Sequence, residues 1–378
     1  DFDFGGLALA HNGNLTNAYL LRKELVRMGC LFQSTTDTEV INHLIARSDY
    51  STVQDRLIDA LGKVKGAYSL LLLTNEALIG VRDPLGVRPL VLGKLDDAWI
   101  LTSETCALDI IGARFERDVD PGEIVIVDGN GPRSIKPFTQ QPRRFCVFEH
   151  IYFARPDSRL EGIGVYEARK RIGMELAVES PVPADVVVPV PDSGVPAAIG
   201  YAHGSGLPFE LGIIRNHYVG RTFIEPADHI RHLGVRLKHN ANRALIEGKR
   251  VILVDDSIVR GTTSKKIVEM VKQAGAREVH MRIAAPPTTN PCFYGIDTPE
   301  RDKLLASRYD VAGMAKFIGV DSLAFVSIDG LYRAMGQPGR DPGQPAFCDA
   351  CFTGDYPIAL DDQIGVEDRQ LSFLAEAV

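Results

Sequence analysis

Apolar residues along this chain alternate between short runs typical of buried strands and the three-to-four-residue spacing of amphipathic helices. The clearest example begins at residues 251–254, Val-Ile-Leu-Val, which predict a strand buried on both faces of a parallel sheet. Residues 264–274 predict a helix, because their apolar positions fall on one helical face before Gly275. A strand, an acidic turn, a glycine-containing loop and a helix therefore follow one another in order.

The same alternation extends over residues 146–345 and indicates βαβ crossovers within a parallel sheet. The predicted elements of this part are strands at 185–190, 251–254 and 279–283 and helices at 197–203 and 264–274.

Residues 1–145 have a different pattern, with short strands such as 67–73 and 124–127 and helices such as 17–28. Apolar periodicity lapses over 132–144, which predicts a loop. A stretch rich in Gly and Pro, from 336 to 345, leads into a tail. We therefore expect a chain of mixed α/β and α+β class in three parts, namely residues 1–145, 146–345 and 346–378.

Candidate chemistry is concentrated directly after residue 254. Asp255 and Asp256 close the predicted strand, where their oxygens are placed to accept from two adjacent sugar hydroxyls and to help hold magnesium. The backbone N–H groups that follow converge at a helix N-terminus, which favours a phosphate. They belong to Ser257, Ile258, Val259, Arg260, Gly261, Thr262 and Thr263. The predicted ligand is a phosphorylated ribose; the alternative is a pair of acids that only solvate a turn.

Composition narrows the class of protein without locating a site. A length of 378 residues allows two domains, and a net charge of -7 without basic blocks argues against a nucleic-acid partner. No apolar run approaches membrane length and no charged-then-apolar leader is present, which favours a cytoplasmic enzyme with no membrane partner. Six cysteines in a chain of this length do not suggest a disulfide framework.

Residues 251–264, VILVDDSIVRGTTS, resemble the phosphoribosyl pyrophosphate (PRPP) binding signature of type I phosphoribosyltransferases. They are most similar to the version in the glutamine PRPP amidotransferase family. Five further segments match that family in order: FEHIYFARPDS (148–158), PVPDSG (189–194), NHYVGRTFI (216–224), KHNANRA (238–244) and CFYGIDTP (292–299). The resemblance thus covers essentially the whole chain.

This resemblance implies a fold and an activity. A glutaminase domain of the Ntn-hydrolase (αββα) type is expected to precede a type I phosphoribosyltransferase domain with a parallel sheet. The activity implied is formation of 5-phosphoribosylamine from PRPP and glutamine-derived ammonia, with release of pyrophosphate and glutamate. This is the first step of de novo purine (IMP) synthesis. Feedback inhibition by purine nucleotides and a homo-oligomeric state are also implied by the family.

Two segments of the first part carry the glutaminase resemblance. In HNGNLTN, Asn12 and Gly13 take the places of the oxyanion-hole residues. Taken alone, this segment is more typical of a tight Asn-Gly hairpin turn. In STTDTE, residues 34–39, Asp37 is expected to pair with the α-ammonium group of glutamine. Alternatively, Asp37 caps the helix that begins near Glu39.

In the transferase part the resemblance assigns Ser193 to the magnesium site, together with Asp255 and Asp256, and places Asp192 near the pyrophosphate. Basic residues recur between 215 and 243, a pattern that is usually a solvated loop. Here it matches the family's mobile loop, in which Lys238 and Arg221 are expected to clamp the diphosphate.

Cys348 and Cys351 form a CxxC pair, and Cys146 and Cys292 complete a possible set of four. The pair in isolation is compatible with a zinc site, a redox motif or two ordinary thiols. All four positions match the ligands of a [4Fe-4S] cluster in the iron–sulfur branch of the family, so a cluster is favoured and zinc is the runner-up.

One departure concerns the glutaminase nucleophile. The family uses a cysteine at the mature N-terminus, whereas this sequence begins at Asp1, and neither Cys30 nor Cys106 lies in a matching motif. The sequence is therefore expected to lack the first portion of its glutaminase domain and to use at most free ammonia. Two rival functions are a PRPP-binding regulator and another type I phosphoribosyltransferase that acts on a nucleobase. Both account for less of the chain.

Overall fold

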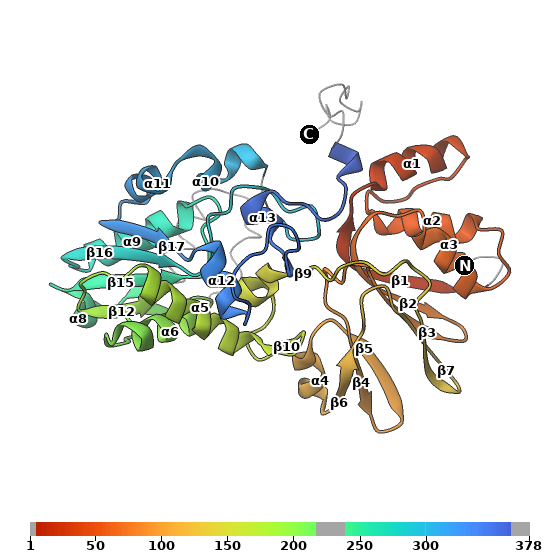
Figure 1. The fold of residues 1–378 in the computed structure, drawn as a ribbon, viewed down its shortest axis with the longest axis horizontal. Helices are drawn as coiled ribbons and strands as arrows, with labels where there is room; N and C mark the ends of the chain where they lie inside the picture. The colour runs from red at the N-terminus through yellow and green to blue at the C-terminus, as the bar shows by residue number, and fades with distance from the viewer. Residues whose placement is uncertain (1–4, 217–238, 299, 364–378) are drawn as a thin grey trace. The chain divides into compact units, whose positions relative to one another are not determined.

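The apolar run at 251–254 forms the centre of β15 (Arg250–Asp255) in the computed structural model, as the sequence predicts. The structure describes residues 5–216, 239–298 and 300–363, which fall into two units (Figure 1). The first unit contains residues 5–146, 292–297 and 355–363; the second contains 147–216, 239–291, 298 and 300–354.

A parallel sheet forms the centre of the second unit. Its order is β12 (Val186–Pro189), β15, β16 (Glu278–Ile283) and β17 (Ser322–Phe325). Each neighbouring pair is parallel, and Val187 lies opposite Ile252. Because parallel strands need crossovers, helices separate them and cover both faces. The carboxyl ends of the strands therefore meet at one edge.

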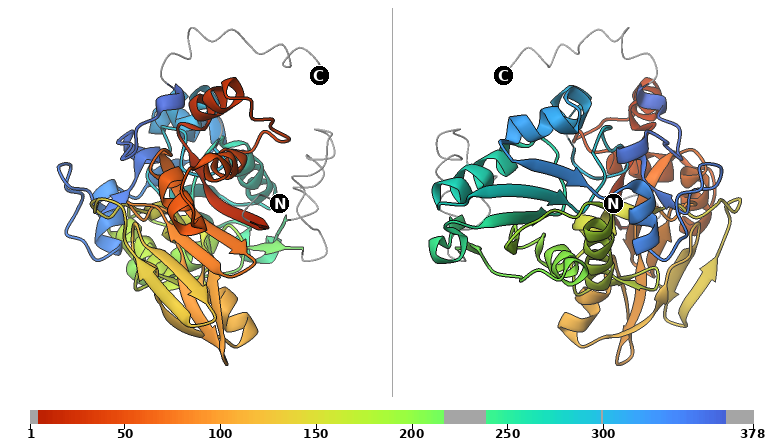
Figure 2. Two further views of the ribbon diagram at one scale, coloured as in Figure 1. Left: turned by 90° about the vertical axis from the view of Figure 1, so that its right-hand side faces the viewer. Right: turned by 60° about the vertical axis from the view of Figure 1, so that its left-hand side comes forward.

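The helices of the second unit lie on both sides of this sheet (Figures 1 and 2). On one side are α5 (Val165–Glu179), α6 (Val195–Ser205) and α12 (Ile328–Ala334), and on the other are α9 (Thr262–Gln273) and α11 (Val311–Ile318). Shorter elements are β10 (Arg159–Leu160), β11 (Ile163–Gly164), β13 (Ile213–Arg215), β14 (His239–Ala241), β18 (Phe347–Cys348), α8 (Arg243–Ile246), α10 (Leu305–Arg308), α13 (Ala350–Thr353), the π-helical turn η1 (Glu149–Phe153) and the 3₁₀ turn η3 (Arg301–Lys303).

Two antiparallel sheets form the first unit. The larger has the order β1 (Leu7–Leu15), β2 (Gly66–Thr74), β3 (Leu78–Arg82), β7 (Ile124–Asp128) and β8 (Gly131–Ile135). The smaller has the order β5 (Ala98–Thr102), β4 (Val91–Leu95) and β6 (Arg114–Asp118). The remaining elements are α1 (Ala18–Arg27), α2 (Thr38–Arg47), α3 (Val53–Leu61), α4 (Thr105–Ile111), β9 (Phe145–Cys146) and the 3₁₀ turn η4 (Asp361–Gln363).

Alternating side chains of β2 join these layers. Leu70 and Leu72 are fully buried beside Ile41 of α2 and Leu57 of α3, whereas Leu71 points to a second core that contains Leu92. This period of two follows from the pleat of a strand. The first unit is therefore a helical layer on one sheet and a second sheet on the other face, in agreement with the expected glutaminase class.

The predicted strands and helices are present, but the predicted loop at 132–144 is partly wrong. Its first residues belong to β8, which pairs with β7 so that Ile126 lies opposite Arg133. Pro132 is tolerated because β8 is the last strand in the sheet order, where a missing backbone donor does not interrupt a further ladder. Within the described ranges, the helices are too short or too polar for any of them to cross a lipid bilayer.

The segment at Asp361–Gln363 packs against the N-terminus of α1. The carboxylate of Asp362 accepts from the backbone N–H groups of Tyr19 (2.8 Å) and Leu20 (3.1 Å). These donors are normally satisfied by the N-cap side chain. Here the N-cap residue Asn17 is occupied with the backbone of Lys63 and Lys65 instead. A residue more than 340 positions away in the sequence therefore caps α1.

We predict that Asp362→Ala lowers the free energy of unfolding of the first unit by about 1 kcal/mol, the usual effect of removing a helix cap. The matched control is Asp361→Ala, which breaks only the exposed ion pair with Lys65 and is expected to cost about 0.5 kcal/mol or less. Urea-induced unfolding measures both variants. An equal loss in the two would contradict the capping role.

Candidate functional site

The predicted phosphate loop, residues 257–263, follows β15 as expected, but its last two residues, Thr262 and Thr263, already belong to α9. Gly261 is the N-cap residue of α9 and has φ 73°, a left-handed conformation that favours glycine. A β-carbon there would lie 2.6 Å from the side chain of Leu305. The N–H group of Leu305 donates to the carbonyl of Val259 (2.8 Å), which holds the loop from outside. The loop before this helix start is thus held by a contact from Leu305 within the chain itself.

The turn after β12 lies against the same edge of the sheet. The N–H group of Val190 donates to the carbonyl of Val254 (2.9 Å), and a β-carbon on Gly194 would lie 2.4 Å from that oxygen. This close approach brings the turn containing Ser193 to the end of β15. Asp192 is exposed and forms an ion pair with Arg215 of β13. Carboxylates and a hydroxyl from two neighbouring strands therefore gather at one edge.

Asp255 and Asp256 are both only 7% exposed. Burial and the neighbouring Asp256 carboxylate raise the pKa of Asp255 well above its usual value. The hydroxyl of Ser257 donates to Asp256 (2.5 Å), and the N–H of Asp256 donates to Asp255 (2.9 Å). Two adjacent buried carboxylates fit a divalent cation, which would compensate their repulsion.

Arg221 and Lys238, the expected diphosphate clamps, lie outside the described residues. The strands on either side of that gap, β13 and β14, pair antiparallel with Arg215 opposite His239.

In the first unit, Asn12 and Gly13 lie inside β1, so the hairpin-turn alternative is wrong. Asn12 is opposite Ser69 and Gly13 is opposite Tyr68 of β2. Gly13 has φ 148°, and a β-carbon would lie 2.0 Å from the carbonyl oxygen of Ala67. The close approach of β2 therefore requires glycine at this position. The segment forms a strand rather than a turn because pairing with β2 over nine residues outweighs the local turn preference.

Asp37 precedes α2, but its side chain does not cap the helix. Its carboxylate accepts from the N–H of Leu15 (2.9 Å) and lies 3.5 Å from the ring of His11. Burial acts to raise the pKa of Asp37, but the hydrogen bond and charge of His11 and the backbone donors Leu15 and Thr38 lower it overall. Asp37 therefore remains ionised, as binding an ammonium group requires.

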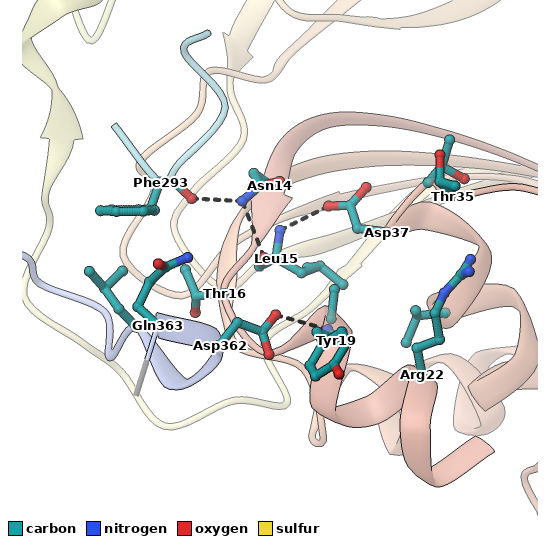
Figure 3. Close-up of a pocket in the computed structure, with 14 residues that line it drawn as sticks. Asn14, Leu15, Thr16, Tyr19, Arg22, Thr35, Asp37, Phe293, Asp362 and Gln363 are labelled. Atoms are coloured by element: carbon teal, nitrogen blue, oxygen red, sulfur yellow. Dashed lines mark hydrogen bonds between the residues drawn. The ribbon is translucent and has the colours of Figure 1, made fainter. Parts of the chain in front are cut away.

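A cavity of about 610 Å³ opens beside Asp37 (Figure 3). Asn14 and Arg22 line it from the first part of the chain, and Asp362 lines it from the last described segment. Arg22 donates to the carbonyl of Ser34 and lies 4.0 Å from the ring centre of Phe32. Helix α1 thus holds the segment that leads to Asp37.

Sequence reasoning missed two residues of this unit whose side chains are buried. The side chain of His11 is 3% exposed, and its Nε2 atom has no hydrogen-bond partner in the described part of the chain. Arg88 is 1% exposed and donates to the side-chain oxygen of Asn12 (2.9 Å). A histidine next to Asn12 was a visible signal, whereas Arg88 lies 76 residues away in the sequence and only folding brings it there.

The four cysteines of the expected cluster are divided between the units. Cys146 and Cys292 belong to the first unit, and Cys348 and Cys351 belong to the second. Cys146 and Cys348 are buried, and burial raises the pKa of the Cys292 thiol. Across the described ranges, no group of three or more His, Cys, Asp or Glu side chains is placed to hold a metal ion.

Known proteins resemble this chain over nearly all of its length. Residues 2–109 match the glutamine amidotransferase domain family, and residues 172–289 match the phosphoribosyl transferase domain family. The chain is 60% identical to the amidophosphoribosyltransferase of Rhizobium etli, over 99% of this chain and 77% of that protein. It is 49% identical to the Bacillus subtilis amidophosphoribosyltransferase, over 99% of this chain and 77% of the relative.

Two solved structures have the same fold. The B. subtilis glutamine PRPP amidotransferase complexed with ADP and GMP superposes with a TM-score of 0.90 at 49% identity, over 95% of this chain and 79% of that chain. A structure described as the allosteric regulatory enzyme of purine biosynthesis gives a TM-score of 0.90 at 48% identity, over 100% of this chain and 80% of that chain.

Fold and site together define an enzyme class in which a glutamine amidotransferase domain is joined to a phosphoribosyltransferase domain. The chain belongs to the amidophosphoribosyltransferase family, the transferases that catalyse the first step of purine biosynthesis. Neither the regulator nor the nucleobase transferase is favoured by these relationships.

We predict that Asp255→Asn, without magnesium at pH 7.5, raises the melting temperature by about 2–4 °C, the shift that corresponds to about 1 kcal/mol. The reason is that the substitution removes the buried charge of Asp255, which the neighbouring Asp256 carboxylate repels. Because the folded-state pKa of Asp255 is raised, the stability of the native chain is greatest below the ordinary Asp pKa and decreases as the pH rises through the folded-state pKa. The difference between variant and native chain should therefore shrink on acidification.

The matched control is Asp185→Asn, at the opposite end of the sheet. The hydrogen bonds of Arg250 lower the pKa of Asp185 to about 2, so this variant should lose stability rather than gain it. Thermal unfolding at pH 7.5 and pH 5 measures both. A loss of stability in Asp255→Asn would contradict the assigned charge repulsion.

Proposed function

We propose that the edge formed by Asp255, Asp256 and the phosphate loop binds PRPP, and that ammonia displaces pyrophosphate there to give 5-phosphoribosylamine. The observation that supports this most directly is the buried carboxylate pair, which a short loop connects to a glycine-capped helix start. The N–H groups of residues 257–263 are proposed to hold the 5′-phosphate, and the carboxylates to accept from the ribose hydroxyls.

The reaction requires positioning and charge stabilisation rather than a protein nucleophile. The C1–oxygen bond to pyrophosphate breaks as ammonia bonds to C1, and the amine then loses a proton. Magnesium, which Ser193, Asp255 and Asp256 would hold, supplies compensation for the leaving negative charge. Arg221 and Lys238 are proposed to clamp the same diphosphate, and Asp192 to lie near it. Ammonia must arrive unprotonated, because ammonium has no lone pair.

For the glutamine half of the reaction, we propose that the Asn12 side chain and the Gly13 N–H stabilise the oxyanion formed at the substrate amide. The ionised Asp37 is proposed to bind the α-ammonium group. The cavity beside Asp37 supports this assignment, because it gives an amino acid access to the carboxylate.

We predict phosphoribosylamine formation from PRPP, magnesium and ammonium chloride, with a rate that rises from pH 7 to 9 as the fraction of free ammonia increases. Asp256→Asn should lower this rate by about 100-fold or more, since preorganised charge stabilisation of the transition state is lost. Asp185→Asn should keep it. Coupled detection of pyrophosphate measures the rate, and calorimetry with PRPP and magnesium separates binding from turnover. Binding without any product would favour the regulator, and product only with a nucleobase would favour the other transferase.

We also propose that Cys146, Cys292, Cys348 and Cys351 bind a [4Fe-4S] cluster. Their positions in the chain support this. The polypeptide passes between the two units at 146/147, 291/292, 297/298 and 354/355. Cys146 and Cys292 are at two of these crossings, and Cys351 is close to a third.

Anaerobic purification is predicted to give a brown protein with about four irons per chain and a broad visible absorbance that bleaches in air. Cys351→Ser should lose the colour. Cys30→Ala is the matched control, because Cys30 belongs to none of the proposed ligands, and it should retain full iron content. A colourless protein that contains zinc would support the alternative metal.

We also make proposals on the regulation, the oligomeric state and the cellular location of this protein. The B. subtilis structure is described as complexed with ADP and GMP, which supports purine nucleotides as feedback inhibitors of this chain. A homo-oligomeric state, a cytoplasmic location and the division at residues 145/146 and 345/346 are likewise proposed.

A further inference from the structure

The loop from Arg82 to Arg88 between β3 and β4 is fixed by a carboxylate without solvent access. Asp83 is fully buried and accepts from the N–H groups of Leu85 (3.0 Å), Val87 (3.0 Å) and Arg88 (3.3 Å). Its partner in the loop, Arg82, is also fully buried and donates to the Arg88 carbonyl (2.8 Å). The backbone at Arg88 is therefore held by hydrogen bonds to two side chains that have no contact with solvent.

The same loop is tied to the strand opposite Asn12. Ser69, which is the cross-strand neighbour of Asn12, donates from its hydroxyl to the carbonyl of Pro89 (2.9 Å). The Arg88 side chain then donates from Nη2 to the Asn12 Oδ1 atom (2.9 Å). The loop thus contacts both Asn12 and Ser69, through the Arg88 side chain and the Pro89 carbonyl respectively.

This contact decides which way the Asn12 amide faces. A guanidinium group has only donors, so the atom that it meets must be the amide oxygen. The Nδ2 atom is therefore on the other side, where it donates to the Ser103 hydroxyl (3.2 Å). Because Nδ2 carries two hydrogens, a second N–H remains for a substrate oxygen.

The contact also changes the strength of that second donor. A hydrogen bond from a cation draws electron density toward Oδ1 and leaves the Nδ2 hydrogens more positive. Arg88 is 1% exposed, so water screens this effect weakly. A more positive N–H interacts better with a developing oxyanion than with the neutral carbonyl of the substrate, and only that difference lowers a barrier.

We propose that Arg88 is a positioning residue for glutamine hydrolysis, which orients and polarises the Asn12 amide. This inference rests on the proposed oxyanion role of Asn12. It assigns a function to an arginine that contacts the reacting amide only through Asn12.

The first experiment records the side-chain amide resonances of selectively ¹⁵N-asparagine-labelled protein. The Asn12 signal, assigned by its loss in Asn12→Asp, is expected downfield in the native chain, displaced upfield in Arg88→Met, and intermediate in Arg88→Lys, which keeps the charge but not the planar fork. The side-chain signals of Asn14 and Asn17 are internal controls, because they donate to the carbonyls of Phe293 and Lys63 and should not move. An unchanged Asn12 signal in both arginine variants, with the controls in place, would overturn the proposal.

The second experiment compares nitrogen sources in the intact enzyme. Arg88→Met should lower the glutamine-dependent kcat by about 10- to 100-fold, somewhat less than full loss of an oxyanion donor, with KM for glutamine nearly unchanged. The ammonia-dependent rate should be unaffected, and Arg88→Lys should recover part of the loss. Asn12→Ala is the reference. If Asn12→Ala has full glutamine-dependent activity, the proposed role of Asn12 fails; if Asn12→Ala is impaired and Arg88→Met is not, only the Arg88 proposal fails.

Discussion

Two adjacent carboxylates held away from water at the end of β15 are the constraint around which the second unit is organised. Burying like charges costs stability unless a cation or hydrogen-bond donors compensate them. The sheet buries them because β15 is a central strand with helices on both faces. A fold that only needed stability would place apolar residues there. The proposed ligands, a metal and a sugar phosphate, would supply the missing compensation.

The first unit depends on polar contacts between segments that are distant in the sequence. Asp37 accepts from β1, Arg88 donates to the side chain of Asn12, and Asp362 caps α1. In each case a charged side chain satisfies groups that the local chain leaves open. Helix α1 then fixes the segment before Asp37 through Arg22. The candidate glutamine site is therefore completed by three residues that are distant from it in the sequence.

The chain also passes between the units several times, and three of the proposed cluster ligands lie at or near these crossings. After Cys351 the chain returns to the first unit at residue 355 and continues to Asp362, which caps α1. The first unit therefore includes both the start and the last described portion of the chain.

The sequence by itself determined the class of the fold and located the candidate phosphate site. The pattern of β15, the paired acids and α9 is local, because strand, turn and helix signals lie within one continuous segment. It correctly predicted the order of the elements and the place of Asp255 and Asp256 at the end of the strand, whereas their burial is seen only in the structure. Local reasoning failed at Asn12–Gly13, where a turn preference was overridden by pairing with β2, and at 132–135, where a strand replaced the predicted loop.

Only the tertiary structure decided how the polar groups are paired. Asp37 resembles a helix cap in the sequence, yet its carboxylate binds the N–H of Leu15 and leaves α2 uncapped by its side chain. Arg88 and Asp362 have no local pattern that distinguishes them from other charged residues. Their roles follow from distances of a few ångströms between residues 76 and 343 positions apart. Hydrogen bonds act over such short distances, whereas sequence patterns report only neighbours along the chain, so these roles required the fold.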